Sequence, residues 1–353
     1  MGQNQRTSIV QIPESANSGI QQCPVVRVAP NELSFNTSTS WRDIYGQRKG
    51  HQPFIKSDFY DGGSFAAEAH SIVSERNPAK HAVMRKYLSN AFSDRSLKEQ
   101  EYLVSEVVDL FIKKIGAKGV DGVDLVLWLN LTTFDIIGNL AFGQSFEGVA
   151  SGTEHFWVSI VVKSLGMGAL ADCFKRKTDR PDYITRILDA RETDDISDIQ
   201  IAAHASDFVI AGSETTATAL ACVIYYLQRN PEVLKKLKNE IRSKFKDYNR
   251  ITAAATATME YLNAVLLEGM RIYPPLPFAL PRVVPEGGDT VDGHFLPAGT
   301  VVSTNPFATC MSSENFTAPW EFKPERWIGS NELDNLEASQ PFSYGVRACL
   351  GRR

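Results

Sequence analysis

Apolar residues recur at helical spacing along most of the chain, whereas strand-like runs are confined to two short regions. In 94–115, an amphipathic helix is indicated by the i, i+4, i+7, i+8 stripe of Leu103, Val107, Leu110 and Phe111, and Gly116 is expected to end it. The same reasoning predicts a short helix at 41–45 capped by Ser40, a helix beginning near residue 78, and helices at 125–142, 231–245 and 258–273.

The longest predicted helix runs from Ser197 to Asn230. Ser197 and Gln200 have the spacing of a capping box, and Pro231 suits the first position of the next helix. About 30 residues at 1.5 Å each span ~45 Å, which is long for a globular helix. Its apolar middle is interrupted by a glycine, an acid and two alcohols: Gly212, Glu214, Thr215 and Thr216. Composition alone fits a half-buried polar face as well as a functional site.

The strand candidates 25–28 and 33–35 lie near the start of the chain, and 282–284, 290–293 and 300–303 lie near its end. We therefore predict a mainly α fold with a small β lobe, its β-rich pieces at about 23–37 and 281–304. Residues 1–22 are polar and read as a disordered tail, and 23–353 as a single domain. With 43% hydrophobic residues and a net charge of −4, the chain suits a globular core, and nucleic-acid binding is not expected.

The five cysteines are dispersed, odd in number and show no C-x-x-C spacing, so we expect neither disulfides nor a zinc site, and a reducing compartment. No apolar run reaches the ~18 residues that a membrane span needs, and the polar N-terminus is neither a signal peptide nor an anchor.

One cysteine stands in a dense pattern at the end of the chain, Pro341–Arg353. Phe342, Gly345, Arg347, Cys349 and Gly351 form F-x-x-G-x-R-x-C-x-G. Neighbouring cations favour the thiolate of Cys349, the glycines let the backbone turn and approach a flat group, and a thiolate is one of the few protein ligands of haem iron. A buried structural cysteine is the alternative, but it does not explain five fixed positions within ten residues.

Two weaker patterns precede it. Glu268 and Arg271 form E-x-x-R on a predicted helix, and Arg326 lies in P-E-R-W downstream. An exposed i,i+3 ion pair is common and contributes only a few tenths of a kcal/mol. One carboxylate shared by two guanidinium groups would instead suit a buried network.

Four patterns occur in the order A-G-x-E-T-T, E-x-x-R, P-E-R-W and F-x-x-G-x-R-x-C-x-G, and in this the chain resembles the cytochrome P-450 family from about residue 24 to its end. The stretches PVVRVAPNELSFN and PAKHAVMRKYLSNAFSDR are similar to the filamentous-fungal secondary-metabolism branch that includes isotrichodermin hydroxylases. The resemblance implies a haem b monooxygenase that inserts one oxygen atom of O2 into an apolar terpenoid or polyketide, as in mycotoxin biosynthesis. It also implies electrons from NADPH through a separate cytochrome P-450 reductase, and the cytosolic face of the endoplasmic reticulum membrane.

The resemblance also implies roles for individual residues. Cys349 would ligate the iron, and cations would bind the haem propionates: Arg347, Arg85, Arg282 and His81. For Arg85 with His81, and for Arg282, an ordinary solvated surface is the alternative. Ala211 and Gly212 would make room for oxygen, Thr215 would bind it and Glu214 would relay protons. Glu268, Arg271 and Arg326 would lock the core on the haem side.

The chain departs from the family pattern in three places: the N-terminal membrane anchor is not found, the channel-roof segment at 164–179 is short, and no helix follows the cysteine. Two further hypotheses therefore stay open. The chain could be a non-catalytic or unstable fragment from a truncated gene model. It could also be a haem-thiolate peroxygenase or isomerase, which needs no reductase.

Overall fold

The computed structural model describes residues 23–63, 69–89, 91–118, 122–153, 183, 187–188, 196–329 and 332–352. The predicted tail at 1–22 and the segment 164–179 lie outside the described residues. By its internal contacts the chain divides into two compact units. Unit 1 comprises Met1–Ser57, Glu232–Lys244 and Met259–Cys349, and unit 2 comprises Asp58–Pro231, Phe245–Thr258 and Leu350–Arg353. The single domain at 23–353 stays a prediction.

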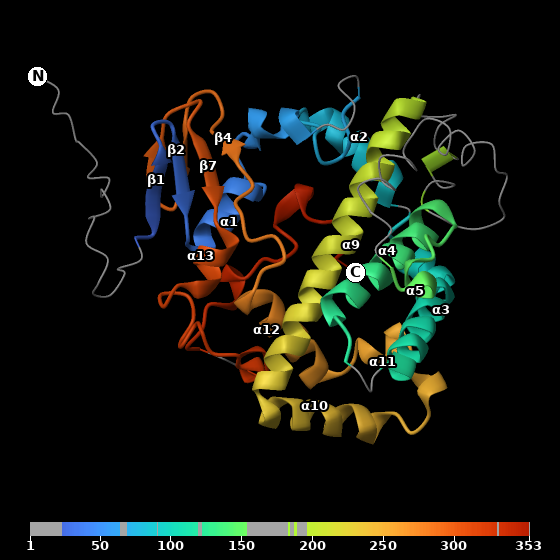
Figure 1. Cartoon of the computed structure of the whole chain (residues 1–353). Coiled ribbons are helices and arrows are strands. Elements are labelled where there is room, and N and C mark those ends of the chain that lie inside the picture. The colour runs from blue at the N-terminus through green and yellow to red at the C-terminus, as the bar shows by residue number, and fades with distance from the viewer. Residues whose placement is uncertain are drawn as a thin grey trace, which may run out of the picture. The chain divides into compact units, whose positions relative to one another are not determined.

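Unit 1 contains a five-stranded sheet in the order β1-β2-β7-β4-β3 (Figure 1). Its strands are β1 (Val25–Ala29), β2 (Glu32–Phe35), β3 (Ile55–Lys56), β4 (Arg282–Val283) and β7 (Val301–Thr304). The β2–β7 pair is parallel and the other pairs are antiparallel. Segments about 270 residues apart in the chain thus pair in one sheet, with Ser34 of β2 opposite Ser303 of β7.

A separate hairpin joins β5 (Asp289–Val291) to β6 (His294–Leu296). Asp292 and Gly293 turn the chain with φ of 50° and 78°, the two positive values that a tight hairpin turn needs. The bounds of the predicted strand 290–293 were therefore wrong. Its last two residues form the turn, and His294 begins the returning strand.

The helices of unit 1 are α1 (Ser38–Tyr45), α10 (Pro231–Lys244), α12 (Glu260–Ile272) and α13 (Pro306–Met311). The cap predicted at Ser40 was wrong, because Thr37 is the N-cap and its hydroxyl accepts from the Ser40 amide at 3.3 Å. Glu240 of α10 caps α12 from outside, since its two carboxylate oxygens each accept a backbone N–H at 2.9 Å, from Tyr261 and Leu262. Short 3-10 turns follow at Pro324–Trp327, Leu336–Ala338 and Gly345–Arg347.

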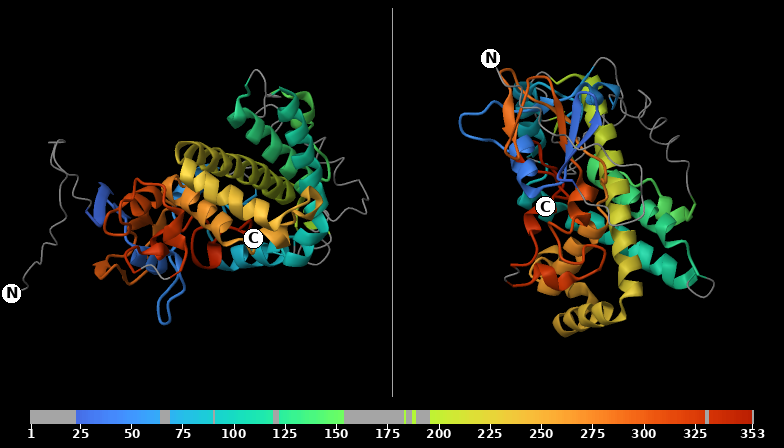
Figure 2. Two further views of the ribbon diagram at one scale, coloured as in Figure 1. Left: turned by 90° about the horizontal axis from the view of Figure 1, so that it is seen from below. Right: turned by 90° about the vertical axis from the view of Figure 1, so that its left-hand side faces the viewer.

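Unit 2 is helical, with α2 (Pro78–Ser89), α3 (Asp94–Lys118), α4 (Leu125–Phe142), α5 (Gly148–Ser151), α9 (Asp198–Arg229) and α11 (Ala253–Thr256). Short 3-10 turns lie at Asp58–Gly63 and Tyr248–Arg250. The long α9 is unbroken, runs from lime to yellow in Figure 1 and Figure 2, and packs on α4. The Ser197 hydroxyl accepts from the Gln200 amide at 3.2 Å, as the capping-box pattern predicts.

The predicted end of α3 at Gly116 was wrong, because the helix continues to Lys118. A Cβ at Gly116 would meet nothing within 4 Å, so this glycine is an ordinary exposed helix position. A single glycine costs about 1 kcal/mol against alanine, too little to stop a 25-residue helix.

By length and composition α4 and α9 are both apolar enough to cross a membrane, which the sequence reading did not anticipate. Over half of the apolar window of α4 is buried within the fold, at 56%, and a core helix of a globular protein passes the same test. The predicted mainly helical fold with a small β lobe is confirmed.

Candidate functional site

Cys349 closes a compact turn that we call the cysteine loop, residues 342–349. The Cys349 amide donates to the Phe342 carbonyl at 2.9 Å, and the Ala348 amide donates to the Gly345 carbonyl at 3.1 Å. These bonds fold eight residues back on themselves, and the thiol-bearing residue at the end of the loop is exposed. The loop therefore holds an exposed cysteine on a hydrogen-bonded backbone.

Gly345 has two independent reasons to be glycine. Its φ is +74°, in the left-handed region that side chains disfavour. A Cβ built on it would also overlap the carbonyl oxygen of Tyr45, the last residue of α1. The signature glycine thus lets the cysteine loop lie directly against the end of a helix that is 300 residues away in the chain.

The residues present fit a thiolate-bound haem, judged by the cysteines that the structure describes. Cys310 is buried, and burial raises the pKa of its thiol to about 11. Cys222 is half-buried, and burial raises the pKa of its thiol as well. A metal ligand must be the thiolate and must be reachable. Cys349 is exposed and stands on the hydrogen-bonded cysteine loop two residues from Arg347, so it fits the second requirement better than Cys222 or Cys310.

The cations predicted for the propionates lie in both units. In unit 1, Arg282 on β4 is 3% exposed, donates to the Pro281 carbonyl at 2.9 Å, and lies over the Tyr45 ring at 5.1 Å. The expectation of a solvated edge-strand charge therefore does not describe Arg282. Arg347 is half-buried on the cysteine loop. In unit 2, α2 carries buried His81 and half-buried Arg85, and Gly351 is an exposed turn residue.

Glu268, Arg271 and Arg326 form a buried ion network in unit 1. The carboxylate of Glu268 accepts from Arg271 Nη2 at 2.8 Å and lies 3.1 Å from Arg326 Nε. All three side chains are between 0% and 2% exposed. Arg271 directs its remaining donors to backbone carbonyls, those of Cys310, Pro319 and Glu321. A fully bonded guanidinium group tolerates burial, because each hydrogen bond offsets part of its lost hydration.

Sequence reasoning missed two members of this network. Trp327, the residue after Arg326, donates its indole N–H to Glu268 Oε2 at 2.9 Å. Asp334 accepts from Arg326 Nη1 at 2.6 Å and from the Thr317 hydroxyl at 2.7 Å. The W of P-E-R-W was the available signal for Trp327, whereas Asp334 stands in no recognisable pattern.

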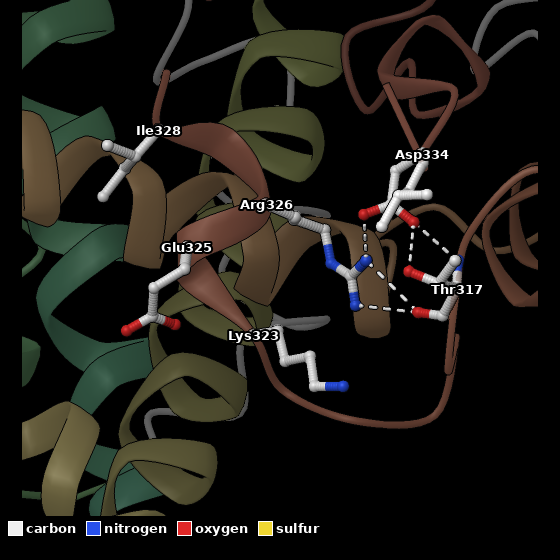
Figure 3. Close-up of a pocket in the computed structure, with 7 residues that line it drawn as sticks. Thr317, Lys323, Glu325, Arg326, Ile328 and Asp334 are labelled. Atoms are coloured by element: carbon white, nitrogen blue, oxygen red, sulfur yellow. Dashed lines mark hydrogen bonds and ion pairs between the residues drawn. The ribbon is translucent and has the colours of Figure 1, made fainter. Parts of the chain in front are cut away.

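Figure 3 shows Arg326 pointing toward Asp334 and Thr317 at the edge of a pocket of about 290 Å³. Lys323 and Glu325 add one charge of each sign to its lining, so the pocket has no net preference for anions or cations. We interpret it as the outer side of the ion network.

In the centre of α9, in unit 2, two side-chain hydroxyls donate hydrogen bonds to backbone carbonyls of the preceding turn. The Thr215 hydroxyl donates to the Ala211 carbonyl at 2.6 Å, and the Ser213 hydroxyl donates to the Val209 carbonyl at 2.6 Å. Glu214 and Ala211 are exposed and Thr215 is half-buried. These hydroxyls leave the helix unbroken, so the polar residues are accommodated without distorting α9.

Gly212 has a packing role that the sequence did not reveal. A Cβ on Gly212 would lie 2.8 Å from Cδ1 of Ile137 on α4, which is closer than carbon atoms approach. The missing side chain therefore lets α9 and α4 pack closely.

The comparisons with known proteins agree with these features. The cytochrome P-450 family model matches residues 50–157 and 169–353. The chain is 54% identical to the cytochrome P-450 monooxygenase ORF11 of Penicillium roqueforti, over 93% of this chain and 77% of that protein. It is 41% identical to the cytochrome P-450 monooxygenase BipB of Cochliobolus sativus, over 93% of this chain and 74% of that protein. It is 36% identical to the cytochrome P-450 monooxygenase BOT4 of Botryotinia fuckeliana, over 93% and 70%.

The match to ORF11 extends over 370 residues although this chain has 353, so the two sequences differ by insertions within the aligned region. The shortened segment at 164–179 and the narrower isotrichodermin-like branch both stay predictions. The family model covers most of the chain, and the three relatives named above are all fungal cytochrome P-450 monooxygenases. The chain belongs to the cytochrome P-450 monooxygenase family.

Proposed function

We propose that this protein binds haem b through Cys349 and inserts one oxygen atom of O2 into an apolar secondary metabolite. The observation that carries the proposal is the exposed thiol on the hydrogen-bonded cysteine loop. A thiolate ligand donates electron density to iron, and the bound haem would supply oxygen activation. The protein would supply the thiolate ligand, the electrostatic environment of the haem and the orientation of the bound substrate.

The cations of each unit have a chemical role in this proposal. Arg282 is buried in unit 1. Its guanidinium group would attract a propionate carboxylate more strongly there than in water, because the effective dielectric constant is lower. Arg347 on the cysteine loop is proposed for the same role, and the resemblance to the family implies that role for Arg85 and His81 of α2 as well. Arginine suits this role because its planar fork binds a carboxylate bidentately.

Thr215 and Glu214 are proposed to handle protons. The Thr215 hydroxyl has one proton, which is committed to the Ala211 carbonyl at 2.6 Å. In this arrangement its oxygen accepts hydrogen bonds, and it donates elsewhere only by leaving Ala211. Glu214 is exposed on the same helix and is able to exchange protons with solvent.

The substrate class and electron donor rest on the resemblance to the fungal secondary-metabolism branch. A terpenoid or polyketide skeleton is the proposed substrate, and a separate NADPH-dependent reductase is the proposed donor. The cytosolic face of the endoplasmic reticulum membrane is the proposed location, where apolar substrates and such a reductase would meet.

The decisive test is to express the chain with haem and record the reduced, CO-bound spectrum. The parent is expected to show a thiolate-type Soret band. Cys349→Ala should lose that band, whereas Cys310→Ala, which removes a buried sulfur, should keep it. A parent that takes up no haem would favour the fragment hypothesis, and an unchanged spectrum in Cys349→Ala would exclude the assigned ligand.

A second test separates the monooxygenase from a peroxygenase or isomerase. Product formation with NADPH, a reductase and O2 supports the proposal, whereas no product under those conditions, with product formed from hydrogen peroxide alone or with no oxidant, supports the other classes. With NADPH, Thr215→Ala is expected to form less product per NADPH consumed than the parent. Equal coupling in both proteins would remove Thr215 from the proton path.

A further inference from the structure

One face of α1 lies against residues 335–345, the segment that leads into the cysteine loop and forms its first turn. Ser38, Trp41, Arg42 and Tyr45 have the spacing i, i+3, i+4, i+7, so they lie along one side of the helix. Each of them meets a residue between 335 and 345. The contact runs the length of the helix and ends four residues before Cys349.

Three of these contacts are polar. Asn335 Nδ2 donates to the Ser38 hydroxyl at 2.7 Å, and the Trp41 indole N–H donates to the Ala338 carbonyl at 3.1 Å. Arg42 forms an ion pair with Glu337. The Trp41 bond is buried, with the ring 2% exposed, so it is shielded from competition with water.

The fourth contact is steric and lies inside the signature. The Tyr45 carbonyl occupies the space that a Cβ of Gly345 would need. The ring of Tyr344 lies against Gly46, where an added Cβ would be 3.2 Å from Tyr344 Cε1. The end of α1 and the turn of the cysteine loop therefore fit together with no room for an additional atom.

Tyr45 also reaches the buried cation of the sheet. Its hydroxyl donates to the Leu280 carbonyl at 2.9 Å and accepts from the Thr304 amide at 3.1 Å. Its ring carries the Arg282 guanidinium group at 5.1 Å. A guanidinium group over an aromatic face is attracted by the ring's electron-rich face, and more strongly when both groups are shielded from water. The backbone of Tyr45 thus contacts the cysteine loop while its side chain contacts Arg282.

We propose that α1 is a splint for the cysteine loop, meaning a rigid support that limits the motion of the loop. Tyr45 is its positioning residue, because it fixes the Cys349 thiol of the loop relative to the guanidinium group of Arg282. The proposal rests on the proposed function for its haem-related consequences. It also has a consequence for the protein without haem, because a splint restricts the cysteine loop whether or not iron is bound.

The test compares the parent with Tyr45→Leu, with Phe54→Leu as the matched control. Phe54 belongs to the same buried cluster as Tyr45, is also 7% exposed, and lies under a different guanidinium group, Arg48, at 5.6 Å. The first measurement is the rate at which the backbone amide hydrogens of Ala348 and Cys349, which close the cysteine loop, exchange with solvent in the haem-free chain, followed by peptide mass spectrometry. Tyr45→Leu should raise this rate at least fivefold over the parent, and Phe54→Leu less than twofold.

The second measurement uses the haem-loaded protein. Tyr45→Leu should lose at least half of the thiolate-type CO band and release haem to apomyoglobin at least ten times faster than Phe54→Leu. Tyr45→Phe keeps the ring and the backbone and should stay within twofold of the parent in both measurements. If Tyr45→Leu does not fold, Gly345→Ala tests the same contact from the loop side and should raise the amide exchange rate of Ala348 and Cys349 to a similar extent.

Rates for Tyr45→Leu or Gly345→Ala within twofold of Phe54→Leu would overturn the splint. A parent that binds no haem would overturn the proposed function instead, and the amide exchange rates would still decide whether α1 restrains the cysteine loop. The two proposals therefore fail in different measurements.

Discussion

Arg326 bridges two buried carboxylates, with Nε 3.1 Å from Glu268 and Nη1 2.6 Å from Asp334. Arg271 binds the other side of Glu268, so the four side chains carry two charges of each sign. The Phe316 ring lies under both guanidinium groups, at 5.1 Å and 5.7 Å. Burying an isolated charge costs several kcal/mol, so this neutral set is stable only when complete.

Removing the charge of Glu268 should therefore be severe. Glu268→Gln leaves two buried guanidinium groups and one carboxylate, that of Asp334, which pairs with Arg326. We expect it to lower the free energy of unfolding by about 3–5 kcal/mol. Urea unfolding followed by circular dichroism measures this loss. Glu325→Gln is the matched control, because Glu325 pairs with Lys236 at a site where both side chains are about half exposed, at 48% and 57%. It should cost less than about 1 kcal/mol, and equal losses in the two variants would contradict a buried network.

Asp334 should behave as a full member of that network. Asp334→Asn keeps the shape and a hydrogen bond to Arg326 but removes the negative charge, leaving the set with a net positive charge. We expect a loss of about 2–4 kcal/mol, close to that of Glu268→Gln, measured in the same urea experiment. A double variant with Glu268→Gln should cost less than the sum of the singles, because the charges share partners. Additive losses would show that Asp334 acts separately.

These residues show how far the sequence could be read. Glu268, Arg271 and Arg326 stand in short patterns that a reader finds by inspection, and the helices follow from periodicity. Asp334, Glu240 and Tyr45 stand in no pattern, because what they do depends on residues up to about 300 positions away. Contacts of that kind come from packing, and periodicity carries no information about them.

Gly212 makes the same point inside a recognised motif. The family reading assigns it to space for oxygen, whereas its absent side chain faces Ile137 of α4. Only the packing of the two helices reveals this requirement, and the role in making room for oxygen stays a prediction.

Gly212→Ala tests the packing requirement. Alanine favours a helix by about 1 kcal/mol, but its Cβ would lie 2.8 Å from Ile137 Cδ1, so we expect a net loss of about 1 kcal/mol. Ile137→Val removes Cδ1 but keeps Cγ1, which would lie 3.0 Å from the new Cβ, so in that background the loss caused by Gly212→Ala should become smaller. Gly116→Ala, where a Cβ meets nothing within 4 Å, should stabilise the protein by up to about 1 kcal/mol. The prediction fails if Gly212→Ala has the same effect with Ile137 and with Val at that position.

His204 on α9 provides a pH-dependent element within unit 2. It is 0% exposed, and its Nδ1 accepts the Ile72 amide N–H at 3.2 Å. A neutral ring with Nδ1 accepting carries its proton on Nε2, which donates to the Tyr87 hydroxyl at 2.7 Å. Burial lowers the pKa of His204 from 6.5 to about 4. A second proton would have to enter at Nδ1, where the Ile72 N–H already points.

The lowered pKa predicts the sign of a stability change. Between pH 6.5 and about 4 the unfolded chain binds a proton at His204 that the folded chain does not, so stability rises with pH across this window. The stability is fully present above pH 6.5 and is lost as the pH falls toward 4, by up to about 3 kcal/mol. Urea unfolding at half-unit pH steps measures the slope. His204→Gln, which cannot be charged, should reduce the slope in this window, whereas substituting the exposed His294 with Gln should leave it intact. A slope that persists in His204→Gln would assign the pH dependence to other groups.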